Sequence, residues 1–452
     1  MENLLVNKVA AVKEVRQAAE YQKKKQACIL TGLAGSSKPV FFAAVDKLLG
    51  GKGSMAFITA SREEIRTYRR ELNYLYPDLP MQELYPVSLP RVQADTQSLE
   101  LQAGRAAALR FLSGEERGIV FITAEALQQK QLRPSGMSGK ALQLAVGEEH
   151  EQRNIAAALL DLGYERTEQV DALGQFCLRG DILDVYPINS SAAVRIEWFD
   201  NELDAMRSFD VDTQRSLQTL TSIKIAPLKV DESFSYDADI FEYCAADTMV
   251  VVDEPVHVFS MLEKLDKENK EHASELFGKQ ELIEQLAANG AVLVSALGHS
   301  YLQQLPSLNI PVRAVAPYNK NTNLLVEDLQ NWLAEGITPL IILSGSIKAR
   351  GFADNLRNYG LKGHFAQKSF EPGVVNVTYG DLDHGFRFWD EEWLLLTEND
   401  IFGMQKRKRL HTKNQGQQLQ YFSDIKAGDY VVHKVHGIGR YIGVENVEVD
   451  AV

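Results

Sequence analysis

Short apolar runs alternate with stretches of helical spacing over the first third of the chain. Three runs of five residues are almost wholly apolar, and they predict strands buried on both faces of a sheet. They are residues 27–31, 55–59 and 119–123. Each is followed by a stretch that predicts a helix, at residues 40–45, 62–75 and 124–131. This alternation predicts a parallel α/β sheet covered on both faces, with residues 1–139 as its first half.

The spacing changes between residues 140 and 228. A helical stretch at residues 153–162 precedes short runs in which apolar and polar positions alternate, with turn residues between them. The runs are residues 175–179, 182–186, 193–199 and 203–209. This pattern predicts a small α+β domain whose antiparallel sheet has one exposed face.

The α/β pattern then returns twice. Residues 229–320, with an apolar strand at 248–254, are expected to be the second half of the first α/β domain. Residues 322–410 predict a third, smaller α/β domain. Its strands are expected at residues 339–344, 374–378 and 392–396, and a helix at 347–359.

The end of the chain has a different composition. Residues 415–420 form a polar tract that resembles a linker or an exposed helix, and residues 411–424 are expected to be a linker. Residues 425–452 contain two runs with glycine at their corners, 429–433 and 436–444, which predict the start of a small β-barrel. Because so short a segment cannot close a stable barrel alone, we expect the chain to stop inside that domain.

Residues 32–39 come close to a phosphate-binding loop but lack two of its working groups. A P-loop has the form G-x-x-x-x-G-K-[ST] between a strand and a helix. Gly32 and Lys38 stand at the right spacing and Gly35 adds a flexible position, but Ser37 replaces the second glycine and Pro39 replaces the hydroxyl that binds Mg²⁺. Proline suits the first turn of a helix, with Ser37 as the expected N-cap. We therefore expect the architecture without the nucleotide chemistry.

Two acidic residues end the predicted strand at 248–254. In an ATPase, such a pair as Asp253-Glu254 would hold Mg²⁺ and orient the attacking water. Next to a loop without its metal-binding hydroxyl, we interpret the pair as a vestige. We expect no metal site and no cofactor for this chain.

Charge and composition narrow the function classes. The net charge is −13, from 61 acidic and 48 basic residues, whereas nucleic-acid binders usually carry a clustered positive surface. The run Lys406–Arg409 is an exception, either a solvated helix end or linker, or a phosphate-contacting patch. Without a membrane-spanning apolar stretch, a secretory signal or a disulfide pattern, a cytoplasmic protein is expected.

Several segments taken together resemble a known family. They are residues 176–187, 194–200, 207–216, 398–403, 428–433 and 436–441. The first two resemble the module shared by UvrB and the bacterial transcription-repair coupling factor (Mfd) family, and the third resembles the coupling factors rather than UvrB. The last two resemble the start of that family's RNA polymerase-interacting domain, which CarD-like regulators share. The resemblance implies a UvrB-like degenerate P-loop domain with the 140–228 module inserted in it.

The resemblance implies two protein partners. The module would recruit UvrA through Arg179, Arg195 and Phe199, residues that match the family's contacts and have the chemistry of binding hot spots. The alternative from the residues alone is that Phe199 is a core residue and that the arginines satisfy local carboxylates such as Asp184 or Glu197.

The terminal segment would bind the β subunit of RNA polymerase by strand addition. Ile438, Arg440, Tyr441 and Ile442 are the expected surface, although about half of them would be ordinary barrel residues by strand alternation. Because the segment is short, we expect this chain itself to bind polymerase weakly.

Members of the family are much longer, and their ATP-driven DNA translocase follows the polymerase-binding domain. The resemblance therefore implies that this chain is an N-terminal portion without that motor and is not itself an enzyme. In the full-length family, DNA would be contacted mainly through the motor. The family also implies a longer stretch between Leu228 and Thr248 than this chain has.

Two functions from different classes remain at this point. The first is a non-enzymatic adaptor of transcription-coupled repair that recruits UvrA. The second is an active UvrB-like, nucleotide-dependent DNA-binding repair enzyme, against which Ser37, Pro39 and the acidic charge argue. A CarD-like transcription regulator is a third, but it gives residues 1–424 no role.

Overall fold

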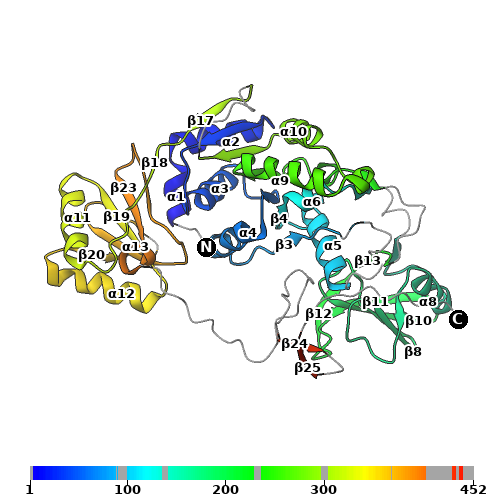
Figure 1. Cartoon of the computed structure of the whole chain (residues 1–452). Coiled ribbons are helices and arrows are strands. Elements are labelled where there is room, and N and C mark those ends of the chain that lie inside the picture. The colour runs from blue at the N-terminus through cyan, green and yellow to red at the C-terminus, as the bar shows by residue number, and fades with distance from the viewer. Residues whose placement is uncertain are drawn as a thin grey trace. The chain divides into compact units, whose positions relative to one another are not determined.

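The computed structural model describes residues 4–87, 89, 99–134, 141–228, 236–296, 304–367, 369–403, 430–433 and 437–440. The chain divides into two compact units, Met1–Gln405 and Lys406–Val452 (Figure 1). Within the described residues, no helix has the length and apolar character needed to cross a membrane.

A seven-stranded parallel sheet forms the centre of the first unit. Its order is β17 (Ser307–Asn309), β1 (Cys28–Thr31), β16 (Val292–Ser295), β15 (Met249–Asp253), β2 (Met55–Thr59), β4 (Ile119–Thr123) and β3 (Met81–Leu84). Strands from before residue 140 and after residue 229 thus share one sheet, so the intervening segment is an insertion in it.

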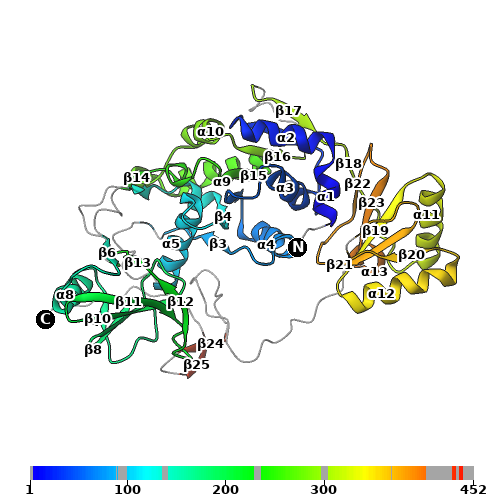
Figure 2. The ribbon, with the colours of Figure 1, turned by 180° about the vertical axis from the view of Figure 1, so that it is seen from behind.

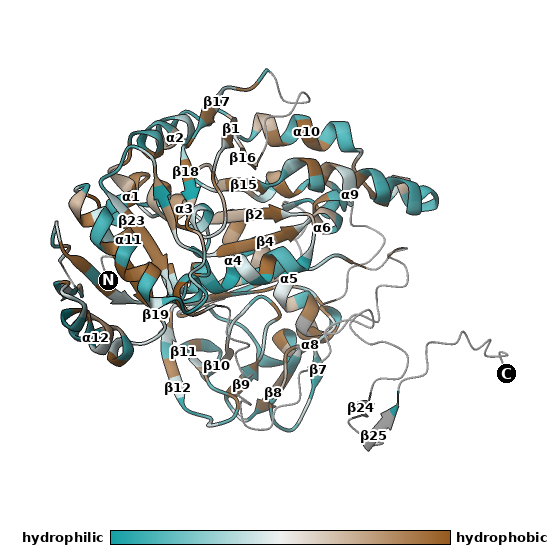
Figure 3. Ribbon diagram, turned by 60° about the vertical axis from the view of Figure 1, so that its left-hand side comes forward, coloured by the Kyte–Doolittle hydropathy of each residue, from teal (hydrophilic) through white to brown (hydrophobic). Residues whose placement is uncertain are grey.

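Helices cover both faces of this sheet because its strands are apolar on both sides. Phe57 of β2 faces a core with α1 (Leu4–Ala10), α2 (Lys13–Lys23), α3 (Ser37–Leu48) and α4 (Arg62–Leu75). The next residue, Ile58, faces the opposite core, which α5 (Leu99–Ser113), α6 (Ala124–Gln128), α9 (Pro255–Glu268) and α10 (Lys279–Ala288) cover. Both β2 and β4 carry the hydrophobic colour in Figure 3. The α/β prediction with a parallel sheet is confirmed.

The inserted module contains a six-stranded sheet. Its order is β12 (Ser216–Leu220), β11 (Glu202–Phe209), β10 (Ala193–Phe199), β9 (Ile182–Val185), β8 (Gln175–Arg179) and β7 (Glu165–Arg166), antiparallel except for β7 with β8. One face packs on α8 (Gln152–Asp161) through Leu159 and Ile196. The ends of the module pair with each other, since β6 (Leu142–Ala145) lies antiparallel to β13 (Ser222–Ile225) (Figure 2). Nearby, β5 (Gln131–Leu132) pairs with β14 (Tyr236–Ala238).

A third sheet is mixed. Its order is β18 (Val312–Ala314), β22 (Phe386–Phe388), β23 (Trp393–Thr397), β19 (Thr338–Leu343), β21 (Val375–Tyr379) and β20 (Gly363–Phe365). One face packs on α11 (Thr322–Ala334), α12 (Ser346–Asn355) and α13 (Glu398–Phe402). Residues of the other face, including Leu340 and Phe386, belong to the same hydrophobic core as α1 and α3. The third sheet therefore has no core of its own on that side.

The connection between the two sheets forms an edge of each. After β17, Ile310 donates its N–H to Thr31 O at 2.8 Å, on the seven-stranded sheet. The next residue, Pro311, accepts the Trp389 N–H at 2.8 Å, at the edge of the third sheet. Gly32 lies close to this connection, because a Cβ added at Gly32 would stand 2.2 Å from Ile310 O.

The second unit is described only as a hairpin. In it β24 (Tyr430–His433) pairs antiparallel with β25 (Gly437–Arg440). The predicted linker at 411–424 and the basic run Lys406–Arg409 lie outside the described residues.

Two local predictions are wrong. The helix expected over residues 124–131 ends at Gln128, because Gln131 and Leu132 pair with β14 instead. The helix expected over 347–359 ends at Asn355 and continues as a 3-10 turn, Leu356–Tyr359.

Candidate functional site

The 32–39 loop joins β1 to α3, the position that a P-loop occupies. Gly32 and Gly35 have φ angles of +88° and +52°, a region that favours glycine. Helix α3 begins at Ser37, so Ser36 and not Ser37 precedes it, which corrects the predicted N-cap. The Ser37 hydroxyl instead bonds back to Ala34 O at 2.8 Å. Pro39 lies buried in the first turn, as its fixed φ allows.

Lys38 turns inward to the two acidic residues at the end of β15. Its Nζ lies 2.7 Å from Asp253 Oδ1 and 3.0 Å from Glu254 Oε1. Burial alone would lower the pKa of Lys38, but the two carboxylates outweigh it and raise the pKa. The ammonium is therefore charged and fully engaged.

This arrangement explains what the loop does chemically. The lysine that would reach a phosphate neutralises the carboxylates that would hold Mg²⁺. Glu254 is fixed in this role by a left-handed backbone (φ +44°) and by accepting the Ala296 N–H at 3.1 Å. Lys38, Asp253 and Glu254 thus form one ion triad. No cluster of metal-ligating side chains occurs within the described part of the chain.

In the inserted module, Asp184 organises two of the predicted UvrA-contacting residues. It is buried and lies directly opposite Arg195 in the β9–β10 register. Arg195 binds it in a bidentate manner, with Nε–Oδ1 at 2.6 Å and Nη2–Oδ2 at 2.8 Å. Arg179 adds a third contact at 3.0 Å. A buried carboxylate needs such partners, so Asp184 fixes both guanidinium groups.

The two arginines differ in exposure. The Arg195 side chain is 18% exposed and stacks on the Phe209 ring at 4.7 Å, while the Arg179 side chain is 53% exposed. Pairing with Asp184, the alternative considered from sequence, therefore exists for both. Arg195 is mostly engaged in the module, whereas about half of the Arg179 side chain stays exposed.

Phe199 is not a core residue. It ends β10 and is 77% exposed, the largest exposure of any aromatic side chain in the described residues. Alternation along β10 places it on the same face as Arg195 and Glu197. The interpretation of Phe199 as core is wrong, because Trp198, one position earlier, fills the core instead.

Other residues on this face were not predicted as site residues. Arg207 forms an ion pair with Glu197, Gln214 accepts from Arg195 at 3.2 Å, and Leu217 on the edge strand is 62% exposed. The cross-strand pairing of Arg195 with Arg207 is the signal that could have found them.

The expected polymerase-binding residues lie partly within the described hairpin. Ile438 is paired with Val432, and the exposed Arg440 with Tyr430. Tyr441 and Ile442 lie outside the described residues.

Two domain families match segments of this chain. The model of the UvrB interaction domain matches residues 142–230, and that of the CarD-like/TRCF RID domain matches residues 425–452. The transcription-repair-coupling factors of Bacillus subtilis and Staphylococcus haemolyticus are each 24% identical to this chain over 94% of its length. That of Staphylococcus epidermidis is 24% identical over 93%.

The chain is similar to the N-terminal portion of transcription-repair-coupling factors. The resemblance inferred from sequence is thereby confirmed, with its UvrB interaction domain and the start of its RID domain. The chain spans 42% of the length of these curated relatives. The matched interaction domain coincides with the inserted module, from β6 to just beyond β13.

Proposed function

We propose that this chain is a recruitment platform of transcription-coupled nucleotide excision repair, on which the inserted module binds UvrA. The observation that carries the proposal is Phe199, a large aromatic side chain left in solvent on the same face of β10 as Arg195, which a buried carboxylate holds. Aromatic and arginine side chains of this kind are typical anchors of protein interfaces.

The module is built to present these groups with little loss of entropy. Asp184 holds both guanidinium groups before any partner arrives, and the sheet holds Phe199 at the end of β10. Pre-ordered side chains lose less freedom on binding, which favours affinity.

The test is a titration of UvrA with the full chain and with Phe199→Ala. Because Phe199 contributes almost nothing to the core, the variant should fold normally and bind UvrA at least about tenfold more weakly. Leu160→Ala, which removes an exposed apolar side chain from α8 on the opposite side of the module, is the matched control. Equal affinities of Phe199→Ala and the parent chain would rule out this surface.

The proposed second partner is RNA polymerase, contacted through residues 425–452. Support comes from the RID match and from the β24–β25 hairpin, whose Arg440 is exposed. Arg440→Ala should weaken retention of the polymerase β subunit in a pull-down.

Under this proposal, the chain acts without nucleotide. The Lys38–Asp253–Glu254 triad supports that view, since it uses the charges that an ATPase needs. ATP and Mg²⁺ would act only in the translocase of the full-length family, together with most DNA contacts.

A further inference from the structure

Two side chains at the 32–39 loop supply hydrogen-bond acceptors at the start of α3. A working loop presents backbone N–H groups to an anion at the helix N-terminus. Here Ser36 and Glu71 of α4 meet at the start of α3, both almost fully buried, and the Ser36 hydroxyl donates to Glu71 Oε1. The negative charge that a helix N-terminus favours is thus supplied by the protein itself.

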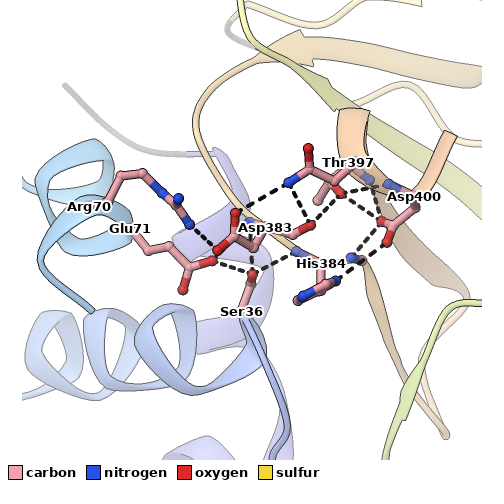
Figure 4. A network of polar contacts seen from close by, with 9 residues as sticks. Ser36, Arg70, Glu71, Asp383, His384, Thr397 and Asp400 are labelled. Atoms are coloured by element: carbon pink, nitrogen blue, oxygen red, sulfur yellow. Dashed lines mark hydrogen bonds and ion pairs between the residues drawn. The ribbon is translucent and has the colours of Figure 1, made fainter. Parts of the chain in front are cut away.

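A loop of the third sheet lies against these two acceptors (Figure 4). Residues 380–385 connect β21 to β22, and two successive amides of this loop point at the acceptors. The Asp383 N–H donates to Glu71 Oε1 at 2.9 Å and to Ser36 Oγ at 3.1 Å. The His384 N–H donates to Ser36 Oγ at 2.9 Å. A Cβ added at Gly35 would stand 3.4 Å from His384 Cβ, so the space beside Gly35 would just admit a methyl group.

The occupying loop is itself held from its own sheet. Its next amide, that of Gly385, donates to Asp400 Oδ2 at 2.6 Å, and Asp383 O accepts the Thr397 hydroxyl at 3.0 Å. The Asp383 carboxylate forms an ion pair with Arg70 across the contact. The loop is therefore held by its own sheet as well as by Ser36 and Glu71.

Packing around this contact is continuous. Leu382, in the middle of the loop, is buried in the core shared by α3 and the third sheet. Nearby, the connection through Ile310 and Pro311 joins the edges of both sheets by backbone hydrogen bonds. The polar contact lies beside this apolar packing, and because Glu71 is itself buried, an unpaired carboxylate there would be costly.

We propose that residues 380–385 are the resident occupant of the 32–39 loop, so that a former anion-binding position has become an amide-binding socket for another part of the same chain. Glu71 gives the socket its selectivity, because its carboxylate accepts amide N–H groups and repels a phosphate.

Amide hydrogen exchange on the full 452-residue chain tests this. Peptides covering residues 380–385 should exchange slowly in the parent chain. In the Ser36→Ala/Glu71→Ala variant, they should exchange at least about tenfold faster, since both acceptors are lost. Glu71→Gln keeps an acceptor oxygen at the same place and should stay close to the parent rate.

Peptides covering β2 and β21 report whether a variant has unfolded as a whole. If the double variant unfolds, the single variant Ser36→Ala carries the decision, with faster exchange confined to residues 380–385 as the expected result. Pyrophosphate added to the parent chain should leave the exchange of these residues unchanged. Rapid exchange in the parent, no change in the folded variants, or release of the loop by pyrophosphate would each overturn the proposal.

Discussion

Lys38 and Asp253 form a partly buried ion pair at 2.7 Å, between the start of α3 and the end of β15. In a nucleotide-binding protein, the corresponding lysine faces the ligand. In this chain, Lys38 binds two carboxylates of the same chain, those of Asp253 and Glu254. Removing the lysine should therefore affect stability and not nucleotide chemistry.

The first prediction concerns Lys38→Ala. The variant leaves two carboxylates without their cation, and its free energy of unfolding should fall by about 3 kcal/mol. Calorimetry with Mg·ATP should give no binding, and a steady-state ATPase assay no turnover, for the parent and the variant alike. Magnesium-dependent ATP binding in the parent that disappears in Lys38→Ala would instead favour the enzyme hypothesis.

A second prediction concerns Asp184→Ala in the inserted module. The variant leaves Arg195 and Arg179 facing each other without their shared carboxylate, so urea unfolding should show a loss of about 3 kcal/mol. Asp181→Ala, an exposed carboxylate on the adjacent turn, should change stability by less than about 0.5 kcal/mol. Similar losses in both variants would show that the buried pairing is unimportant.

Glu71 gives a prediction about pH. Burial raises the pKa of Glu71 above its ordinary value of 4.5, although the Ser36 and Asp383 hydrogen bonds oppose this. The folded chain then holds this proton to a higher pH than the unfolded chain, so its stabilising contribution is lost as the pH rises from about 4.5 through the folded pKa. Glu71→Gln has no such charge to bury.

The stability of Glu71→Gln relative to the parent should consequently increase over that pH range. Urea titrations at a series of pH values measure the difference. Glu71→Ala, which lacks the acceptor oxygen, should be less stable than Glu71→Gln at every pH. A difference between parent and Glu71→Gln that does not vary with pH would contradict this account.

The fourth prediction separates two demands on glycine. Gly32 and Gly50 both have positive φ angles, but only at Gly32 would a Cβ meet another backbone atom, Ile310 O. Gly50→Ala should cost about 1 kcal/mol for its backbone conformation, and Gly32→Ala at least about 2 kcal/mol more. Thermal unfolding of the two variants provides the comparison, and equal losses would exclude the close approach.

Local patterns predicted the elements that are bounded by strong turn signals. The strands at 55–59, 119–123, 175–179 and 193–199 and the helix at 62–75 have the predicted limits. That helix begins where Ser61 and Glu64 form a capping box, a signal written in four neighbouring residues. The helix predicted over residues 124–131 is too long, because residues at its expected end pair with the distant strand β14.

The candidate sites also differ in whether nearby residues or distant segments determine them. The two departures from the P-loop pattern, Ser37 and Pro39, are visible in the sequence, and the resemblance supplied Phe199. The docking of Asp383 on Ser36 joins residues 347 positions apart through backbone amides, which every sequence contains. Neither the composition nor the spacing of residues could have predicted this contact.

The pairing of Leu142 with Ile225 means that the inserted module enters and leaves its host at nearly the same point. An insertion whose two ends lie together does not force the strands of the surrounding sheet apart. Such a segment can be replaced as a unit. It could be exchanged for another binding domain, or moved into a different host, while the parallel strands on either side keep their register.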